Sequence, residues 1–91
     1  MKRLVRYLLI KMPQTAQQVA NEIGSKERRF FAMDEDSRWY SYSSKPIKVI
    51  AGSVWVPHGV DDEYSNVTEK FQDIHPKPNW RDSLVEYREK H

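Results

Sequence analysis

The spacing of apolar positions changes along the chain, from helical to alternating and back to helical. In residues 15–24 small and aliphatic side chains recur every three or four positions, with a threonine before them and a glycine after them as candidate caps. Residues 28–33 and 39–43 favour strands, because both are rich in aromatic residues and the second alternates between two faces. The polar turn Asp34–Ser37 separates them. The pattern therefore predicts a helix followed by a β-hairpin.

A third strand and an N-terminal strand complete the predicted sheet. Residues 47–56 are expected to form the third strand of an antiparallel meander, with Gly52 in its interior as a bulge or a close backbone approach. Residues 2–12 mix aliphatic, aromatic and basic side chains before Pro13, which favours a strand, with a short helix as the alternative.

Two later segments show helical spacing. Asn66 and Glu69 resemble a capping box within a first segment, whose apolar face holds Tyr64, Val67, Phe71 and Ile74. A terminal helix is expected to begin at Asn79 as its N-cap and to carry Trp80, Leu84 and Tyr87 on one face. We therefore expect an α+β fold: a small antiparallel sheet, made of a meander of about three strands plus an N-terminal strand, packed by one to three helices in a single domain over residues 1–91.

Composition changes which side chains we expect in the core. Hydrophobic residues make up 38% of the chain and aromatic residues 12%. Because aliphatic side chains are scarce, the rings must supply much of the core, and each can bury about 150 to 250 Å². A helix covers only one face of a sheet, so the other face is expected to leave some rings exposed.

Cysteine and the N-terminal sequence bear on location. The chain has no cysteine, which excludes disulfides and Cys-based zinc sites and favours a reducing compartment. The basic and apolar N-terminus resembles a signal peptide, but Arg6 and Lys11 interrupt its apolar run and no small-residue cleavage site follows. A transmembrane helix needs about 20 apolar residues, and the sequence has no such run. We expect a cytoplasmic protein that does not enter a membrane.

Candidate catalytic and metal-binding groups are sparse. The acidic turn before Ser37 lacks the ligand spacing and the central glycine of a calcium loop. The histidines His58, His75 and His91 are far apart and lack metal-ligand spacing. Several serines precede His58, but no nucleophile elbow accompanies them, and the three glycines form no phosphate loop. We expect no enzyme activity, no metal and no cofactor.

Aromatic and basic residues in the middle of the chain are typical of a binding surface. The formal net charge is only +2, but the first third of the chain is basic and the last third acidic. Aromatic and arginine side chains commonly anchor protein interfaces. The sequence therefore predicts a partner-binding surface made of Arg28, Arg29, Trp39, Tyr40, Tyr42 and Trp55.

Nucleic acid is the alternative partner. Basic side chains beside exposed rings can hold phosphates while the rings stack on bases. The predicted set for this function is Lys2, Arg3, Arg6, Lys26, Arg28 and Arg29. Residues 14–24 also resemble the first helix of a helix-turn-helix module, but the expected strand at residues 28–33 takes the place of a recognition helix.

Three stretches resemble small, mostly uncharacterised proteins of tailed bacteriophages and prophages. They are D-E-D-S-R-W-Y-S-Y-S-S-K-P (34–46), S-V-W-V (53–56) and N-W-R-D-S-L (79–84). Where those proteins usually have a glycine after the acidic pair, this chain has Ser37. The resemblance implies an accessory protein that binds and modulates or inhibits a host protein, as anti-restriction and anti-CRISPR proteins do. A minor virion component is a further alternative.

Overall fold

The structure of the protein, a computed structural model, describes residues 13–89, so the strand predicted for residues 2–12 lies outside the described residues. The described part contains one α-helix, two short 3-10 helices and six short strands. In chain order these are α2 (Ala16–Ile23), β1 (Phe30–Met33), β2 (Trp39–Tyr42), β3 (Ile47–Val49), β4 (Val54–Val56), β5 (Tyr64–Asn66), η1 (Thr68–Phe71), η2 (Trp80–Asp82) and β6 (Val85–Glu86). The predicted α+β class with a small antiparallel sheet is confirmed.

The helix α2 forms where the sequence predicts it, and its caps explain its limits. The Thr15 side chain accepts a hydrogen bond from the Gln18 amide, and the Gln18 side chain accepts one from the Thr15 amide, which completes a capping box. At the other end the Gly24 amide donates to the carbonyl of Ala20. The buried face of α2 presents Val19 and Ala20 to the core.

The predicted hairpin of β1 and β2 is also confirmed. The strands pair antiparallel, with Phe30 opposite Tyr42 and Met33 opposite Trp39. In the connecting turn Ser37 has a φ of 71°, in the left-handed region that favours glycine.

The meander does not continue beyond this hairpin. Residues 47–56 form two strands and not one: β3 and β4 pair with each other as a separate two-stranded sheet. The chain reverses at residues 50–53, where the Ser53 amide donates to the Ile50 carbonyl and Ser53 has a φ of 56°. Gly52 therefore lies in a turn and not in a bulge. The chain uses these residues to return on itself, and β2 pairs instead with β5.

The predictions of two later helices are largely wrong. Residues 64–66 form β5, whose backbone pairs with β2, and a 3-10 turn, η1, replaces the rest of the expected helix. Asn79 does cap the terminal segment, since its side chain accepts from the Arg81 amide, but only the short η2 follows. The chain then extends as β6 and pairs with β1. In both segments strand pairing satisfies backbone groups that a helix would otherwise satisfy internally.

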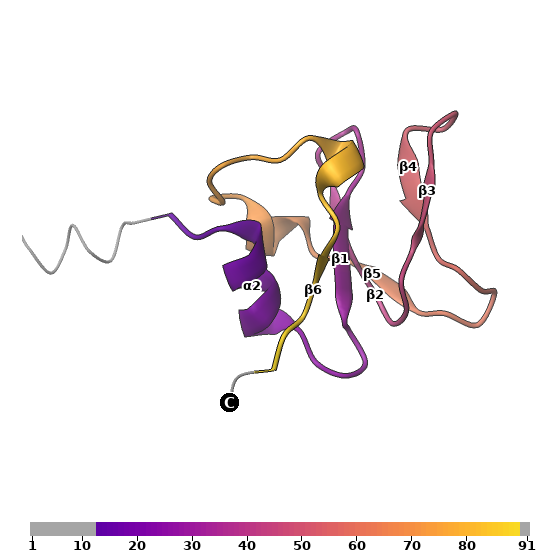
Figure 1. The fold of residues 1–91 in the computed structure, drawn as a ribbon, viewed down its shortest axis with the longest axis horizontal. Helices are drawn as coiled ribbons and strands as arrows, with labels where there is room; N and C mark the ends of the chain where they lie inside the picture. The colour runs from indigo at the N-terminus through magenta and orange to yellow at the C-terminus, as the bar shows by residue number, and fades with distance from the viewer. Residues whose placement is uncertain (1–12, 90–91) are drawn as a thin grey trace, which may run out of the picture.

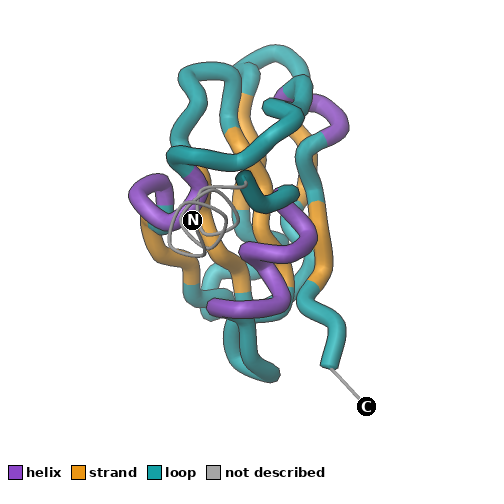
Figure 2. Tube along the Cα trace, turned by 90° about the vertical axis from the view of Figure 1, so that its left-hand side faces the viewer, coloured by secondary structure: helices purple, strands orange, loops and turns teal. Residues whose placement is uncertain are grey.

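The four-stranded sheet has the order β5-β2-β1-β6 and lies between two layers. Figure 1 shows α2 on one side of this sheet and the hairpin of β3 and β4 on the other. Seen from the α2 side, helical segments lie in front of the strands (Figure 2). Phe31, Met33 and Trp39 share the helix-covered face, while Tyr40, Tyr42 and Tyr64 share the opposite face, which we call the hairpin face.

Candidate functional site

Three of the four rings predicted to anchor a partner are buried. The exposed fraction is 3% for Trp39, 2% for Tyr42 and 8% for Trp55. Trp39 stacks on Phe71 of η1 with ring centroids 4.1 Å apart, and the Trp55 indole donates to the carbonyl of Trp80. The expectation that these three rings are exposed is therefore wrong, because a chain with so few aliphatic residues needs them in its core. Only Tyr40 is half-buried.

Tyr42 fastens the hairpin face to β4. Its hydroxyl donates to the Trp55 carbonyl at 3.2 Å. Burial raises the pKa of the Tyr42 phenol far above its usual value, and the negative charge of Asp34 adds to the effect. The phenol therefore stays neutral and serves as a fixed hydrogen-bond donor.

The predicted basic residues do not form one surface. Arg28 and Arg29 are exposed, as the prediction requires, but Arg29 makes an ion pair with Glu86 at 2.8 Å. Lys26 and Arg29 line one hollow, which they share with Glu89, and Arg28 lines another, which it shares with two further glutamates. Lys2, Arg3 and Arg6 lie outside the described residues. The nucleic-acid function stays a prediction. The three basic residues of this set that the structure describes, Lys26, Arg28 and Arg29, each have a glutamate nearby.

A groove opens on the hairpin face, between the four-stranded sheet and the hairpin of β3 and β4. Its volume is about 230 Å³. One wall is made by three tyrosines of the sheet and the other by apolar residues at and after β4. We call it the tyrosine groove, and its lining residues are Asp34, Tyr40, Tyr42, Val54, Trp55, Val56, Pro57 and Tyr64.

Tyr64 is the ring of this groove that solvent reaches most freely, with an exposed fraction of 58%. Its centroid lies 6.2 Å from that of Tyr40 and 6.2 Å from that of Tyr42. The strand pairing that places Tyr64 opposite Tyr42 creates this cluster. Sequence reasoning missed Tyr64 as a site residue, because helical spacing had assigned it to the apolar face of a helix. The alternation of Tyr40 and Tyr42 was the available signal for this face.

Asp34 is the one charged residue in the lining of the tyrosine groove. Its Oδ1 accepts a hydrogen bond from the Trp55 amide at 2.9 Å, which joins the β1–β2 turn to β4. Burial raises the pKa of Asp34, and the nearby charge of Asp36 also raises it, while the bond from Trp55 acts in the opposite direction. The Trp55 amide thus orients the carboxyl group, but this one hydrogen bond does not replace all the hydration that the carboxylate loses on burial.

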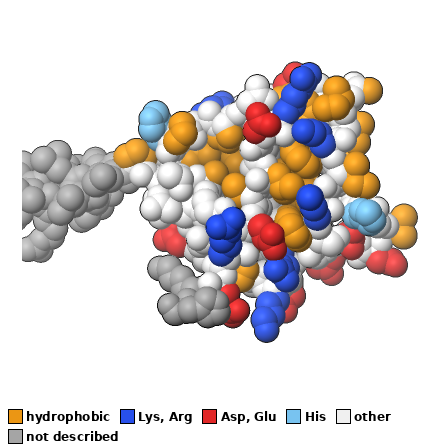
Figure 3. Space-filling model, viewed as in Figure 1, with side chains coloured by type: hydrophobic (Ala, Val, Ile, Leu, Met, Phe, Trp, Pro, Cys, Tyr) orange, Lys and Arg blue, Asp and Glu red, His pale blue; other side chains and the backbone are white. Residues whose placement is uncertain are grey.

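Exposed apolar side chains also lie on the β3–β4 hairpin and on the loop that follows it. Ile47, Ile50 and Val60 are exposed in addition to Tyr64. Figure 3 shows apolar side chains gathered on the side of the molecule where the hairpin lies. We call these three residues the apolar margin of the tyrosine groove. An apolar surface next to a ring-lined groove is typical of a protein interaction site.

The loop that carries Val60 is fixed by an aspartate. Asp62 Oδ2 accepts hydrogen bonds from the Ser44 hydroxyl at 2.6 Å and from the Gly59 amide at 2.8 Å. These bonds lower the pKa of Asp62, the bond from Ser44 having the larger effect. The turn therefore holds Val60 at its tip, where the side chain is fully exposed.

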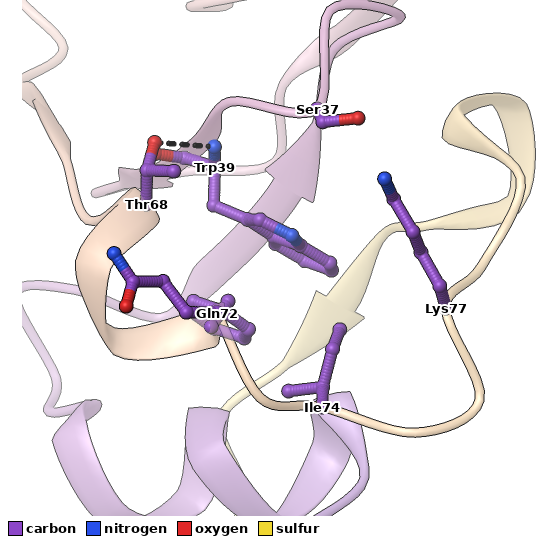
Figure 4. A pocket seen from close by; sticks show the side chains of 7 residues that line it. Ser37, Trp39, Thr68, Gln72, Ile74 and Lys77 are labelled. Atoms are coloured by element: carbon purple, nitrogen blue, oxygen red, sulfur yellow. Dashed lines mark hydrogen bonds between the residues drawn. The ribbon is translucent and has the colours of Figure 1, made fainter.

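A second hollow lies on the helix-covered side of the sheet. Its volume is about 220 Å³, and Figure 4 shows Trp39, Ile74 and Lys77 around it. Thr68 accepts a hydrogen bond from the Trp39 amide at its edge. The Trp39 ring is stacked on Phe71 and nearly buried, so this hollow exposes little aromatic surface. The tyrosine groove is the stronger candidate site.

His58 and His75 are both exposed, and His91 lies outside the described residues. Within residues 13–89, no group of three or more histidine and acidic side chains is placed to hold a metal ion. In that same span no helix has the length and apolarity needed to cross a bilayer.

Comparison with known proteins gives no relative. No family model, no curated protein and no solved structure matches the chain.

Proposed function

We propose that the chain is a protein-binding domain that modulates its partner without catalysing a reaction, and that it makes contact through the tyrosine groove and its apolar margin. The observation that carries this proposal is the exposure of Tyr64 beside Tyr40 in a groove that faces an apolar hairpin. The hydrophobic core is built from other rings, among them Trp39, Tyr42 and Trp55, and does not include Tyr64. The exposed Tyr64 ring is therefore available to a partner.

The chemistry of this surface suits a protein partner. Tyrosine is frequent among the residues that carry most of the binding energy of interfaces, since its ring gives a large contact area and few rotatable bonds. Isoleucine and valine around such a ring exclude water from the contact. The surface combines one exposed ring, one half-buried ring and three exposed aliphatic side chains on neighbouring segments.

The resemblance of residues 34–46, 53–56 and 79–84 to small phage proteins supports a host protein as the partner. On this proposal the chain acts in the cytoplasm of the host cell as an inhibitor or modulator, for example of a defence enzyme, and uses no cofactor. Occupying a surface of that enzyme would be sufficient for inhibition.

A nucleic-acid partner ranks second. Binding to phosphates depends on clustered basic side chains and weakens steeply with salt. Lys26, Arg28 and Arg29 are shared between two hollows that also contain glutamates, which reduces the positive potential of each. An apolar protein contact persists at about 1 M salt, where the screening length is about 3 Å.

The proposal is tested by capture of proteins from bacterial lysate with the full chain and two variants. Tyr64→Ser removes the exposed ring, and Lys70→Ser, on the exposed surface of η1, is the matched control. We expect one protein to be retained in stoichiometric amount by the natural chain and by the control at high salt. Tyr64→Ser should weaken its binding by about 30-fold, the effect of losing about 2 kcal/mol at a central ring.

Two results would contradict the proposal. One is equal retention of the same protein by Tyr64→Ser and by the natural chain, which would place the contact elsewhere. The other is recovery of nucleic acid alone, with affinity that falls steeply between low and moderate salt. Circular dichroism of each variant establishes that the fold is unchanged.

A further inference from the structure

On the basis of the protein-binding function proposed above, we infer that the tyrosine groove receives an arginine side chain of the partner, with the guanidinium against the carboxylate of Asp34 and the ring of Tyr64. The charge of the groove, the nature of its walls and the orientation of its acid all favour this guest.

The charge of the groove is negative and is not neutralised from within. Asp34 is the one ionisable carboxylate among the lining residues. Within residues 13–89 no basic side chain lies within ion-pair distance of it, since the ion pairs there join Arg29 to Glu86 and Arg38 to Asp36. Lys48, the one basic residue of the β3–β4 hairpin, donates to the carbonyl of Arg81 and lies over the Trp55 ring. Asp34 is thus left without an ion-pair partner among residues 13–89.

A half-buried carboxylate in such a groove favours an incoming positive charge. Apolar walls remove part of its water, and a cationic partner would compensate for that loss. The pKa of Asp34 is raised in this structure, which is the direction expected of an acid that lacks such a partner.

The walls match the two parts of an arginine side chain. The methylene stem is apolar and can lie along Val54, Val56 and Pro57. The guanidinium is planar and stacks on aromatic faces, for which Tyr64 and Tyr40 provide the rings. Lysine is a less suitable guest, because its ammonium is compact and strongly hydrated and cannot stack.

The orientation of Asp34 completes the fit. Its Oδ1 is held by the Trp55 amide, so the carboxyl group is fixed at the groove and need not be ordered when a guest binds. The second oxygen, Oδ2, can accept a charge-assisted hydrogen bond from the guanidinium. The Trp55 amide is therefore a built-in reporter of what binds to Asp34.

Nuclear magnetic resonance of the isotope-labelled full chain provides the test. The probes are acetyl-arginine amide and acetyl-citrulline amide, which has nearly the same shape but no charge. We expect arginine to shift the signals of the Trp55 amide and the Tyr64 ring in a saturable manner, with binding at least tenfold weaker for citrulline. No shift at these two positions, or an equal response to both probes, would overturn the inference.

Variants separate the local acid from general charge. Asp34→Asn keeps an oxygen that can accept from the Trp55 amide but removes the negative charge, so it should lose the arginine response while its other signals stay in place. The matched control is Asp36→Asn, an exposed acid two residues away that pairs with Arg38 and does not line the groove. If both variants lose the response to the same extent, the groove does not recognise arginine.

The same variants distinguish failure of this inference from failure of the proposed function. A captured partner that is lost with Tyr64→Ser but retained fully by Asp34→Asn would leave the protein-binding function standing and contradict arginine recognition. An arginine response abolished by Asp34→Asn, with no protein whose capture depends on Tyr64, would support the chemistry of the groove and contradict the protein-binding function.

Discussion

Asp34 shows how one side chain connects the fold to the candidate site. The sequence places it in a polar turn, where a solvated acid is the ordinary expectation. In the structure its carboxylate holds the amide of Trp55, and the neighbouring amide of Glu35 donates to the Ser53 carbonyl. The turn of the first hairpin is thereby joined to the second hairpin, and the acid that makes this connection also lines the tyrosine groove.

The raised pKa of Asp34 predicts a particular dependence of stability on pH. A group whose pKa is higher in the folded than in the unfolded state binds its proton more tightly when folded. Its contribution to stability is therefore present below the ordinary value of 3.8 and is lost as the pH rises through the folded pKa. We expect Asp34→Asn, which cannot ionise, to gain stability relative to the natural chain as the pH is raised from about 4 to 7.

Urea unfolding of both proteins across this range measures the difference directly. Asp62 titrates in both and has a lowered pKa, so its stabilisation is lost as the pH falls and cancels in the comparison. Asp34→Ala is the control for the hydrogen bond: it should be less stable than Asp34→Asn by about 1 kcal/mol at all pH values, because neither residue ionises and only the alanine leaves the Trp55 amide without its acceptor. A difference between Asp34→Asn and the natural chain that falls with pH would contradict the prediction.

Several residues in the stretches 34–46, 53–56 and 79–84 have a structural role inside the fold. Trp39, Trp55 and Trp80 are buried, and the Ser83 hydroxyl accepts from the Met33 amide and donates to the Trp80 carbonyl at 2.8 Å. Residues of this kind preserve a way of packing. Their presence in the sequence is therefore explained by the packing of this fold and does not identify a binding partner.

At the scale of elements, the sequence predicted correctly the helix and the hairpin, whose signals lie within a few neighbouring residues. The helix α2 has an apolar face, a capping box and a terminal glycine within ten residues, and the hairpin of β1 and β2 has two ring-rich strands around a polar turn. The strands β5 and β6 have two or three residues each, too few to show a period. Their conformation comes from pairing with distant strands, and helical spacing of Tyr64, Val67 and Phe71 was coincidental.

Gly24 and Gly52 predict contrasting responses to the same substitution. A Cβ at Gly24 would lie 2.5 Å from the Ala20 carbonyl oxygen and 2.7 Å from Tyr87 Cβ, so α2 and the segment after β6 would have to separate. We expect Gly24→Ala to destabilise the fold by about 1 to 3 kcal/mol, the usual effect of overpacking. The measurement is the urea midpoint.

Gly52→Ala is the matched control. Its Cβ would meet nothing closer than 3.5 Å, at Val54, and its φ lies outside the left-handed region. This variant should unfold within about 0.5 kcal/mol of the natural chain. Equal destabilisation by both substitutions would show that the close approach at Gly24 does not limit the packing of α2.

At the scale of the molecule, the two sheets share one core through Trp55. This residue belongs to the small β3–β4 sheet, yet its indole donates to the Trp80 carbonyl and its backbone carbonyl accepts from Tyr42. The hydrophobic cluster includes residues of α2, the four-stranded sheet, β4, η1 and η2. The hairpin is thus a layer of the same domain and not an appendage.

This shared core predicts that the hairpin and the four-stranded sheet unfold together. A variant with Trp39→Phe and Trp80→Phe retains Trp55 as its single tryptophan, so its fluorescence reports on the hairpin. We expect the midpoint seen by fluorescence to coincide with that seen by far-ultraviolet circular dichroism, as in a two-state transition. Trp55→Phe, with the other two retained, is the control. An earlier loss of the Trp55 signal would show that the hairpin opens independently.

The candidate site could be predicted only in part, because it depends on contacts between segments that are distant in the sequence. Tyr40 was predicted as one of four aromatic anchors, and the sequence did not separate it from Trp39, Tyr42 and Trp55, which the structure buries. The tyrosine groove also needs Asp34, the valines of β4 and Tyr64, which come from three further segments of the chain. Their proximity depends on the fold of 47–56 into a hairpin and on the pairing of β2 with β5. Neither contact has a local signal in the sequence.

The way α2 lies along β6 has a consequence for solubility. The Gln17 side chain donates to the Glu86 carbonyl, and the Asn21 side chain accepts from the Arg88 amide, so polar groups on the outward edge of β6 are already bonded. Such an edge cannot template another strand, which is how sheets start to aggregate. Within the described residues, β5 is the other edge of this sheet. Self-association by strand addition is therefore directed to the edge that carries Tyr64.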